Sequence, residues 1–467
     1  MARKWWTLVA VCTATFMLLL DITIVNVALP AIEKALDASF SDLQWVVDAY
    51  ALALATCVLT AGALADLFGR KRLFLLGIAL FTIASAACGI PWDPLFLIVA
   101  RGVQGIGGAM MFATALALLS QEFHGKERGT AFGLWAAVIG AAVAIGPLAG
   151  GMLTSWISWR WIFLVNIPIG VAAILFGARQ LHESSDPEHS RLDPPGLVTL
   201  TAGLFCLILA LIEGNDHGWT SGLIVVLLVV AVVALGVFIA TQSRDGATMI
   251  DLALFRRPAF VGAQVTAFAI ASSMFAMFLY LTLYLQNILG LSPLETGVRF
   301  LPLSLVSFFA APLAGRLTGH VPIRGLLAFG LALNAIALWS MSRVGVDSHW
   351  TVLLPGFLLA GVGIGFVNAP LATTAVSTVA VQRAGMASGI NNAFRQIGLA
   401  TGIAALGAIF ASKAGDQRSQ AEFVHGLHDI LLVGAAVAAI GAVLAGVLVR
   451  RRDFVASGPQ QAEAAAG

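Results

Sequence analysis

The sequence contains few charged residues. Asp, Glu, Lys and Arg make up 11% of its 467 residues, whereas soluble domains contain about 25%. Hydrophobic residues make up 59%, and the mean hydropathy is +0.92. Such a chain cannot cover a folded core with polar side chains, so we expect it to lie in a lipid bilayer. The net charge of +2, without a long basic tract, argues against nucleic acid as a partner.

Residues for covalent and metal chemistry are also few. The four cysteines are isolated within apolar runs, at Cys12, Cys57, Cys88 and Cys206, which is typical of small packing residues rather than of disulfides or metal ligands. The eight histidines are scattered, and no catalytic Ser/His/Asp cluster stands out. The phosphate-binding pattern GxxxxGK(S/T) does not occur. We therefore expect no enzyme activity, no metal and no drive by ATP.

Long apolar runs dominate what is present. A membrane-spanning helix needs about 20 predominantly apolar residues. The sequence predicts about fourteen spans, at residues 7–29, 43–64, 73–91, 95–120, 130–153, 161–178, 195–213, 221–241, 259–287, 295–317, 323–342, 351–379, 385–411 and 427–449. The signal is weakest for 195–213 and 221–241. We expect the first run to be a retained span rather than a signal peptide, because it contains Asp21 and no small-residue cleavage site follows it.

The basic residues predict the orientation of these spans. Of the 26 Lys and Arg residues, eighteen fall on one side of the predicted bilayer and five on the other, and the remaining three lie in or at the edge of spans. Cytoplasmic loops carry an excess of Lys and Arg. Both termini are therefore expected in the cytoplasm of a multi-pass cell-membrane protein, which requires an even number of spans.

Glycines repeat along the chain at a fixed distance. Four glycines of the first half have a partner 256 residues later, in the pairs Gly105 and Gly361, Gly107 and Gly363, Gly133 and Gly389, and Gly146 and Gly402. Two similar halves around a central site are typical of secondary transporters. The repeat predicts a six-helix bundle over residues 1–180, two inserted transmembrane helices with cytoplasmic linkers over 181–250, and a second six-helix bundle over 251–452. We expect the tail, 453–467, to be disordered.

Several ordered motifs resemble a known family. They are LDITIVNVALP (Leu20 to Pro30), GALADLFGRKR (Gly62 to Arg72), RGVQGIGGAM (Arg101 to Met110), GAAVAIGPLAGG (Gly140 to Gly151), WRWIFLVNIPIG (Trp159 to Gly170), YLQNILGLSPLETG (Tyr284 to Gly297) and GINNAFRQIGLATG (Gly389 to Gly402). In this order they resemble the major facilitator superfamily, and within it the fourteen-helix drug:proton antiporters (EmrB/QacA-like multidrug exporters). The resemblance implies an all-α major facilitator fold and export driven by the proton gradient, with no cofactor.

Three charged residues are candidates for proton coupling. An acid in the middle of the membrane costs about 2.5–3.5 kcal/mol on insertion scales, so it is a functional candidate by default. Asp21 and Asp48 lie in the first two spans, where burial would favour the neutral carboxyl group and allow proton exchange. The resemblance links these acids to coupling or to recognition of cationic drugs. Arg101 is the candidate partner of a membrane carboxylate, although the sequence does not show which one. The alternatives are fixed structural carboxylates and an arginine that reaches the interface.

Two glycine-containing motifs are expected to serve the conformational cycle. Gly62, Asp66, Gly69 and Arg70 have the spacing of a charge latch at a tight cytoplasmic turn, and the alternative is a plain topology signal. Gly146, Pro147, Gly150 and Gly151 resemble the motif that is typical of antiporters. Proline bends a helix, and glycine allows close packing. Ordinary small-residue packing is the alternative here.

The substrate site is predicted only in outline. Polar and aromatic residues of the spans are candidates, namely Asn26, Trp45, Tyr50, Trp135, Phe268, Phe275, Tyr280, Tyr284, Gln286, Phe366, Asn368, Asn391, Asn392, Arg395 and Gln396. Asn391, Arg395 and Gln396 carry most weight, because polar groups in a span need a buried partner or a cavity. Aromatic residues in membrane proteins more often contact lipid or neighbouring helices.

These observations predict a proton-coupled exporter of drugs or other small, largely apolar or cationic compounds. Its expected partners are the substrate, protons and lipid. A dedicated exporter of one endogenous metabolite, antibiotic or lipid is the alternative within transport. A non-transporting membrane sensor and a membrane enzyme are alternatives from other classes. The sequence identifies no outer-membrane or periplasmic partner.

Overall fold

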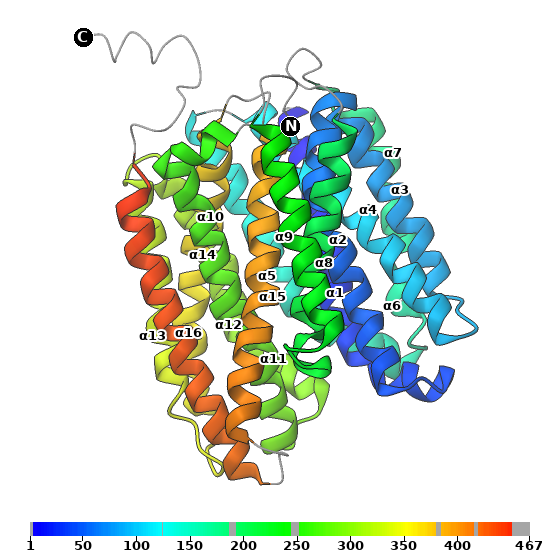
Figure 1. Cartoon of the computed structure of the whole chain (residues 1–467), viewed down its shortest axis with the longest axis vertical. Helices are drawn as coiled ribbons and strands as arrows, with labels where there is room; N and C mark the ends of the chain where they lie inside the picture. The colour runs from blue at the N-terminus through cyan, green and yellow to red at the C-terminus, as the bar shows by residue number, and fades with distance from the viewer. Residues whose placement is uncertain are drawn as a thin grey trace.

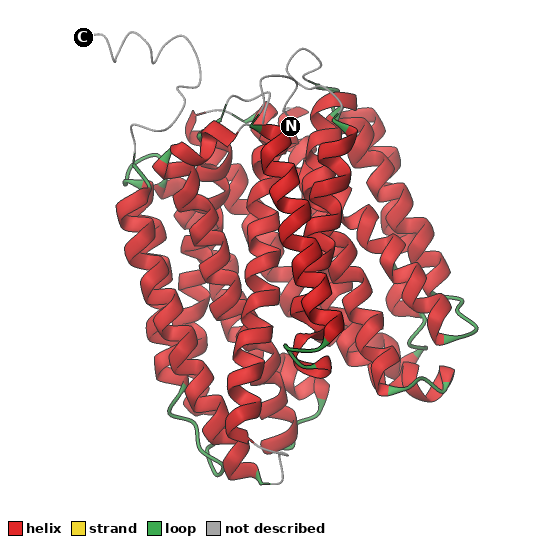
Figure 2. Ribbon diagram, in the orientation of Figure 1, coloured by secondary structure: helices red, strands yellow, loops and turns green. Residues whose placement is uncertain are grey.

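The computed structural model describes residues 3–123, 125–185, 193–243, 252–379, 384–414 and 419–450. These residues form one bundle of long helices, and none of them lies in a strand (Figures 1 and 2). The predicted all-α membrane fold is confirmed. Both the start of α1 and the end of α16 lie at the same end of the bundle (Figure 1), which we call the terminal face. The predicted tail, 453–467, lies outside the described residues.

The first half of the bundle contains the helices that precede residue 181. They are α1 (Arg3–Leu36), α2 (Phe40–Phe68), α3 (Arg70–Cys88), α4 (Pro94–Glu122), α5 (Gly125–Trp156), α6 (Trp161–Leu164) and α7 (Asn166–Gln180). Two more helices follow, α8 (Pro194–His217) and α9 (Gly222–Gln242). These two confirm the spans that the sequence signals most weakly.

The second half contains the remaining helices. They are α10 (Pro258–Ile270), α11 (Ala276–Leu283), α12 (Pro293–Leu317), α13 (Ile323–Met341), α14 (Leu354–Ser377), α15 (Ala384–Ala414) and α16 (Gln420–Leu448). Short 3-10 helices occur at η1 (Leu252–Arg256) and η4 (Trp350–Leu353), and π-helical segments at η2 (Ala271–Phe275) and η3 (Tyr284–Ile288). The predicted span 259–287 is thus one long helix that two π-helical turns interrupt.

Thirteen helices of the described part are long and apolar enough to cross a membrane. They match every predicted span except 130–153, which corresponds to α5. Helix α5 has 32 residues and so is about 48 Å long, more than the roughly 30 Å of a bilayer core. It packs between α1 and α12. The architecture therefore has about fourteen spans.

The glycine repeat reappears in the contacts between the two halves. A Cβ atom built on Gly133 of α5 would lie 2.8 Å from Pro312 Cα of α12, and one built on Gly389 of α15 would lie 3.2 Å from Val58 O of α2. The two contacts are reciprocal, because each joins the fifth long helix of one half to the second long helix of the other. Because glycine has no side chain, it allows this close approach of membrane helices.

A second repeated pair lies within the halves. A Cβ atom on Gly146 of α5 would lie 2.6 Å from Thr23 Cβ of α1, and one on Gly402 of α15 would lie 2.6 Å from Ser272 Cα of η2. Gly402 therefore packs against the π-helical turn η2, whereas Gly146 packs against the regular helix α1. π-Helical turns often mark functional places in a helix.

Helices α8 and α9 lie beside the boundary between the halves rather than apart from it (Figure 1). Thr201 of α8 and Thr60 of α2 share a hydrogen bond between their hydroxyl oxygens at 2.9 Å, and Asn215 Nδ2 donates to Ala404 O of α15 at 3.0 Å. Helix α9 packs on α8 and exposes a row of valines, including Val226, Val229 and Val233. Helix α8 thus contacts both halves, and α9 presents a surface suited to lipid.

The close contact between Gly315 and Gly129 allows this packing to be tested. Gly315 of α12 and Gly129 of α5 face each other without side chains, and a Cβ on Gly315 would lie 3.0 Å from Gly133 Cα and closer still to Gly129 O. We expect Gly315→Ala to lower the stability of the purified protein by about 1–3 kcal/mol through overpacking. Thermal unfolding in detergent would measure the change.

Gly325→Ala is the matched control, because no atom lies within 4 Å of a Cβ built there. Its unfolding temperature should be unchanged or higher, since alanine favours helix over glycine. Equal unfolding temperatures for the two variants would contradict the proposed close contact.

Candidate functional site

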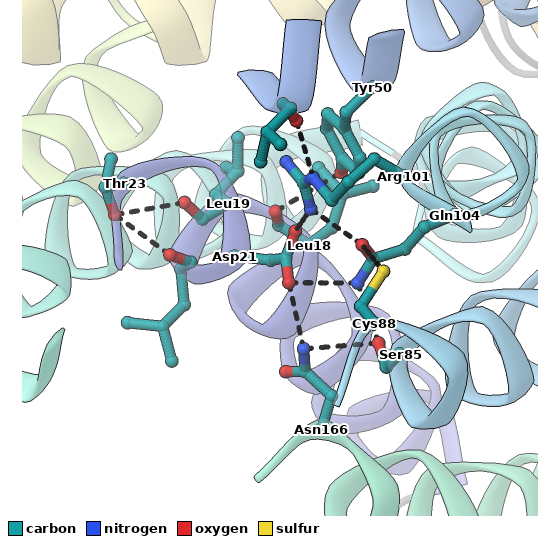
Figure 3. A network of polar contacts seen from close by, with 12 residues as sticks. Leu18, Leu19, Asp21, Thr23, Tyr50, Ser85, Cys88, Arg101, Gln104 and Asn166 are labelled. Carbon is teal, nitrogen blue, oxygen red and sulfur yellow. Dashed lines mark hydrogen bonds and ion pairs between the residues drawn. The ribbon is translucent and has the colours of Figure 1, made fainter. Parts of the chain in front are cut away.

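The acid in the first span is buried in the middle of the first half. Asp21 lies on α1 and is 1% exposed. Figure 3 shows its carboxylate at the centre of a network of polar side chains that come from neighbouring helices. A carboxylate at such a place is stable as an anion only if donors and a positive charge surround it.

Arg101 of α4 supplies the positive charge. Its Nη1 atom pairs with Asp21 Oδ2, and the arginine is also 1% exposed. Its Nε donates to Val46 O at 3.0 Å, and its guanidinium carbon lies 4.3 Å from the centre of the Tyr50 ring. Both Val46 and Tyr50 belong to α2. The structure therefore identifies the carboxylate partner that the sequence left open, and it shows how α2 holds the arginine in place.

Two amide side chains complete the surroundings of the carboxylate. Gln104 Nε2 of α4 donates to Asp21 Oδ1 at 2.9 Å, and Asn166 Nδ2 of α7 donates to the same oxygen at 3.0 Å. Both amides also contact Ser85 Oγ of α3, at 2.7 and 3.3 Å (Figure 3). The network thus joins α1, α2, α3, α4 and α7.

The sequence analysis did not select Gln104, Ser85 or Asn166 as site residues. Gln104 follows Arg101 by three residues, so the two share one face of α4, and this spacing could have pointed to it. Asn166 lies in the motif WRWIFLVNIPIG. Its side-chain amide is the polar group of this motif that donates to Asp21. Ser85 carried no signal, because serine is common in membrane helices.

The arrangement surrounds one buried carboxylate with donors from three other side chains. Asp21 accepts hydrogen bonds from one guanidinium and two amides. A proton on the carboxyl group removes half of the ion pair and leaves the guanidinium without its counter-charge. Because the pair is buried, that change acts in a low-dielectric medium, where it has a large effect on how α1 and α4 pack.

Two of the predicted latch residues, Asp66 and Arg70, form a buried ion pair. Asp66 Oδ1 accepts hydrogen bonds from Arg70 Nε and Nη2 at 2.9 and 2.8 Å, and both side chains are buried. The other carboxylate oxygen, Oδ2, accepts from the backbone N–H of Met386 at 2.9 Å. Met386 lies in the first turn of α15, so the acid stabilises the positive end of a helix of the opposite half.

Gly69 makes the turn of this latch. It has a φ of 110°, which L side chains rarely adopt, and it separates α2 from α3. A Cβ there would also lie 2.6 Å from the Glu183 carboxylate, whose oxygens accept the backbone N–H groups of Lys71 and Arg72. Gly62 is buried within α2.

The predicted antiporter motif lies where α5 crosses α1 and approaches α12. Gly146 is the point of contact with Thr23, two residues beyond Asp21. Gly150 is buried, and a Cβ on Gly151 would make an ordinary contact of 3.7 Å with Leu294 of α12. The side chain of Pro147 lies outside the described residues.

The predicted substrate residues of the first half do not gather in one place. Tyr50 belongs to the Asp21 network, and Trp135 is buried with its Nε1 donating to Thr15 Oγ1 at 3.0 Å. Trp45 packs with Leu52 and Ile208 beside α8. Asp48 is half-buried on α2, and its predicted role stays a prediction. The side chain of Asn26 lies outside the described residues.

Those of the second half form a polar cluster between α10, α14 and α15. Asn391 Nδ2 donates to Gln264 Oε1 at 3.2 Å and to Ala263 O at 3.3 Å, and Arg395 Nη2 donates to Asn368 Oδ1 at 3.1 Å. Asn392 is buried beside them, and Gln396 is half-buried.

The aromatic candidates of the second half lie elsewhere. Tyr284 donates to Gly345 O at 2.7 Å, Tyr280 stacks on Phe410, and Phe366 contacts Phe329. Gln286 is half-buried in η3. Substrate contact by these residues stays a prediction. In the part of the chain that is described, no three His, Cys, Asp or Glu side chains lie close enough to hold a metal ion.

Residues 11–403 match the family model described as Major Facilitator Superfamily. The tetracenomycin C resistance and export protein of Streptomyces glaucescens is 36% identical over 415 residues, which cover 89% of this chain and 77% of the relative. The multidrug resistance protein Stp of Mycobacterium tuberculosis is 37% identical over 407 residues, 87% of this chain and 76% of the relative. The puromycin resistance protein of Streptomyces alboniger is 37% identical over 469 residues, covering 97% and 93%.

Solved structures share the same fold. The human organic anion transporter MFSD10 (TETRAN) superposes with a TM-score of 0.70 at 13% identity, over 95% of this chain and 100% of that one. The proton:xylose symporter XylE superposes with a TM-score of 0.69 at 12% identity, over 96% of both chains. At these identities the likeness concerns the arrangement of the helices.

The buried pair can be tested by its contribution to stability. Asp21→Asn and Arg101→Gln each leave one buried charge without its partner, which typically destabilises a protein by about 3–5 kcal/mol. The double variant removes both charges, and its loss of stability should be clearly smaller than the sum of the two single losses. Thermal unfolding of the purified protein would measure the cycle.

Glu127→Gln is a suitable control, because it breaks an ion pair with Lys4 in which the Glu127 side chain is 54% exposed. Exposed pairs contribute about 0–1 kcal/mol, so this variant should unfold near the wild-type temperature. Additive losses for Asp21→Asn and Arg101→Gln would mean that the two charges do not stabilise each other.

Proposed function

This chain belongs to the major facilitator superfamily, and from that membership we propose that it exports small, largely apolar drug-like compounds in exchange for protons. The relatives named for antibiotic or multidrug resistance and export support the direction of transport. The buried Asp21–Arg101 pair is the observation that carries the proton-coupled part of the proposal.

The geometry indicates how a proton would drive the exchange. With Asp21 ionised, Arg101 holds α1 and α4 together, and its contacts to Val46 and the Tyr50 ring hold α2 to the same place. Protonation of Asp21 cancels the ionic part of this contact. The arginine is then held by neutral partners only, and the first half can adopt a different packing of α1 against α4 and α5. Gly146, in contact with Thr23 of α1, places α5 next to the moving segment.

The latch connects such a change to the second half. In the present arrangement Asp66 of α2 accepts the N–H of Met386 in α15, so the two halves are joined near the terminal face. A rocking motion that opens this face must break that hydrogen bond. Asp66 keeps Arg70 as a partner in either case, because the two lie one helical turn apart.

The proton gradient is a sufficient source of energy. One charge that crosses a potential of 100 mV releases about 2.3 kcal/mol, which supports a concentration gradient of roughly 50-fold. We therefore propose that the protein lies in the cell membrane with both termini in the cytoplasm. The excess of Lys and Arg on the side of the termini favours this orientation. The ion pair between Lys4 and Glu127 puts the start of α1 beside the start of α5 at the terminal face.

Export of one compound is a second candidate function. Two of the relatives are named for a single antibiotic, tetracenomycin C and puromycin, and one is named for many drugs. The same proton network would serve either function. The breadth of the resistance that the chain confers on a drug-sensitive host distinguishes the two.

Purified protein in liposomes with an imposed pH gradient tests the proposal. We expect ethidium to move with the gradient and the movement to collapse when a protonophore is added. Asp21→Asn should abolish the gradient-driven part, because the amide cannot take up a proton, while the control Glu127→Gln should transport like the wild type.

Two results would count against the proposed coupling. Gradient-driven flux that persists in folded Asp21→Asn would exclude Asp21 as the coupling residue. Flux that is insensitive to the protonophore would exclude proton exchange as the driving reaction.

A further inference from the structure

Another charge within the membrane-spanning part of the chain is not used by the proton network. Arg395 belongs to the span Met386–Phe410 of α15. Its Nη2 atom donates to the neutral Asn368 side chain at 3.1 Å. Among the residues that the structure describes, no Asp or Glu pairs with this guanidinium. Arg101, by contrast, has Asp21 as its counter-ion.

The cluster around Arg395 has donors to spare. The Nε atom of Arg395 is buried without a hydrogen-bond partner, and so is the Nδ2 atom of Asn392. The two residues are three positions apart, so they share one face of α15. Buried donors normally have acceptors. Arg395 as a whole remains half-buried, so the cluster is not closed on all sides.

The cluster lies where a transporter is expected to bind its substrate. Helix α15 meets α2 of the first half at Gly389, and α14 meets α5 through Ala369, which follows Asn368 directly and packs with Ala136 and Ala137. Both helices that hold the guanidinium therefore contact the first half and run along the boundary of the two halves. Sites of secondary transporters lie at this boundary, near the middle of the membrane.

The internal repeat argues against a purely structural role. With the offset of 256 residues that the glycines define, Arg395 corresponds to Ile139 and Asn368 corresponds to Phe112. Both counterparts are buried apolar side chains in the first half. The fold therefore packs these two positions without a charge or an amide, so the polar groups of the second half call for another explanation.

We propose that Arg395, together with Asn368 and Asn392, forms a subsite for an anionic group, so that the exported compounds include molecules with a carboxylate on an apolar body. The proposal rests on the proposed export function and names a substrate class for it. A carboxylate offers acceptors only and can take two N–H groups of one guanidinium. A cationic group would find a like charge here and no free acceptor among the unpaired atoms.

Equilibrium binding to the purified full-length protein in detergent tests the subsite. Rhodamine B and its ethyl ester share one dye body and differ in whether the carboxylate is free. We expect the wild type to bind rhodamine B more tightly than the ester. Arg395→Gln should weaken rhodamine B binding by roughly tenfold or more and leave ester binding unchanged. Arg395→Lys should retain part of the preference, because it keeps the charge without the planar fork.

Asn368→Asp provides a second variant, which keeps the size of the side chain and replaces its amide with a carboxylate. It places an acid of the same shape next to the guanidinium, so Arg395 gains an internal counter-ion and the carboxylate preference should disappear. Arg343→Gln is the control, because Arg343 is an exposed arginine beside Trp339. Its binding of both dyes should equal that of the wild type.

The outcomes separate this proposal from the proposed export function, because binding needs no gradient. Wild-type protein that binds the ester as tightly as the acid, or neither dye, would overturn the anionic subsite whatever the flux assay shows. Unchanged rhodamine B binding in both Arg395→Gln and Asn368→Asp would do the same. If Arg395→Gln loses both dyes through misfolding, Asn368→Asp alone decides. A carboxylate preference without gradient-driven flux would leave the subsite standing and refute proton-coupled export.

Discussion

The attraction between one carboxylate and one guanidinium organises the first half of this protein. Asp21 and Arg101 are both 1% exposed, and a charge in that position is tolerated only while its partner is present. Gln104, Asn166 and Ser85 fill the remaining hydrogen-bonding positions, so α1, α2, α3, α4 and α7 all depend on the same pair. Under the proposed function, a proton on Asp21 would weaken this pair, and that effect would connect the stability of the first half with transport.

Close backbone contacts join the two halves. Helix α5 meets α12 at Gly133, and α15 meets α2 at Gly389, so the fifth long helix of each half contacts the second long helix of the other. Asp66 adds a polar contact to Met386. Among the described residues, the two halves thus touch through close glycine contacts, through this hydrogen bond and through packed apolar side chains such as Leu59 and Ile390. Helix α8 contacts both halves at this boundary and therefore has to follow their movement.

The two halves share a backbone plan and differ in their charge. In the first half, the positive charge of Arg101 is balanced within the bundle. In the second half, Arg395 has only a neutral partner among the described residues, while the matching position of the first half holds Ile139. Under the two proposals made above, a duplicated fold provides one half that carries a proton and another that contacts an anionic substrate. The same helix positions serve both, since the chemistry depends on the side chains and not on the helix arrangement.

The sequence alone determined the membrane class, the approximate number of spans and the repeat, and it pointed to Asp21 and Arg101 as candidate site residues. These features are local, because each span must satisfy its own backbone hydrogen bonds in lipid and a charge inside an apolar run is conspicuous. Only the tertiary structure decided that Arg101 meets Asp21, that Tyr50 and Trp135 are internal contacts, that Asp66 reaches Met386, and that α8 lies at the boundary of the halves. Partners of this kind depend on how helices distant in the chain rotate and cross, and no local pattern of residues encodes that geometry.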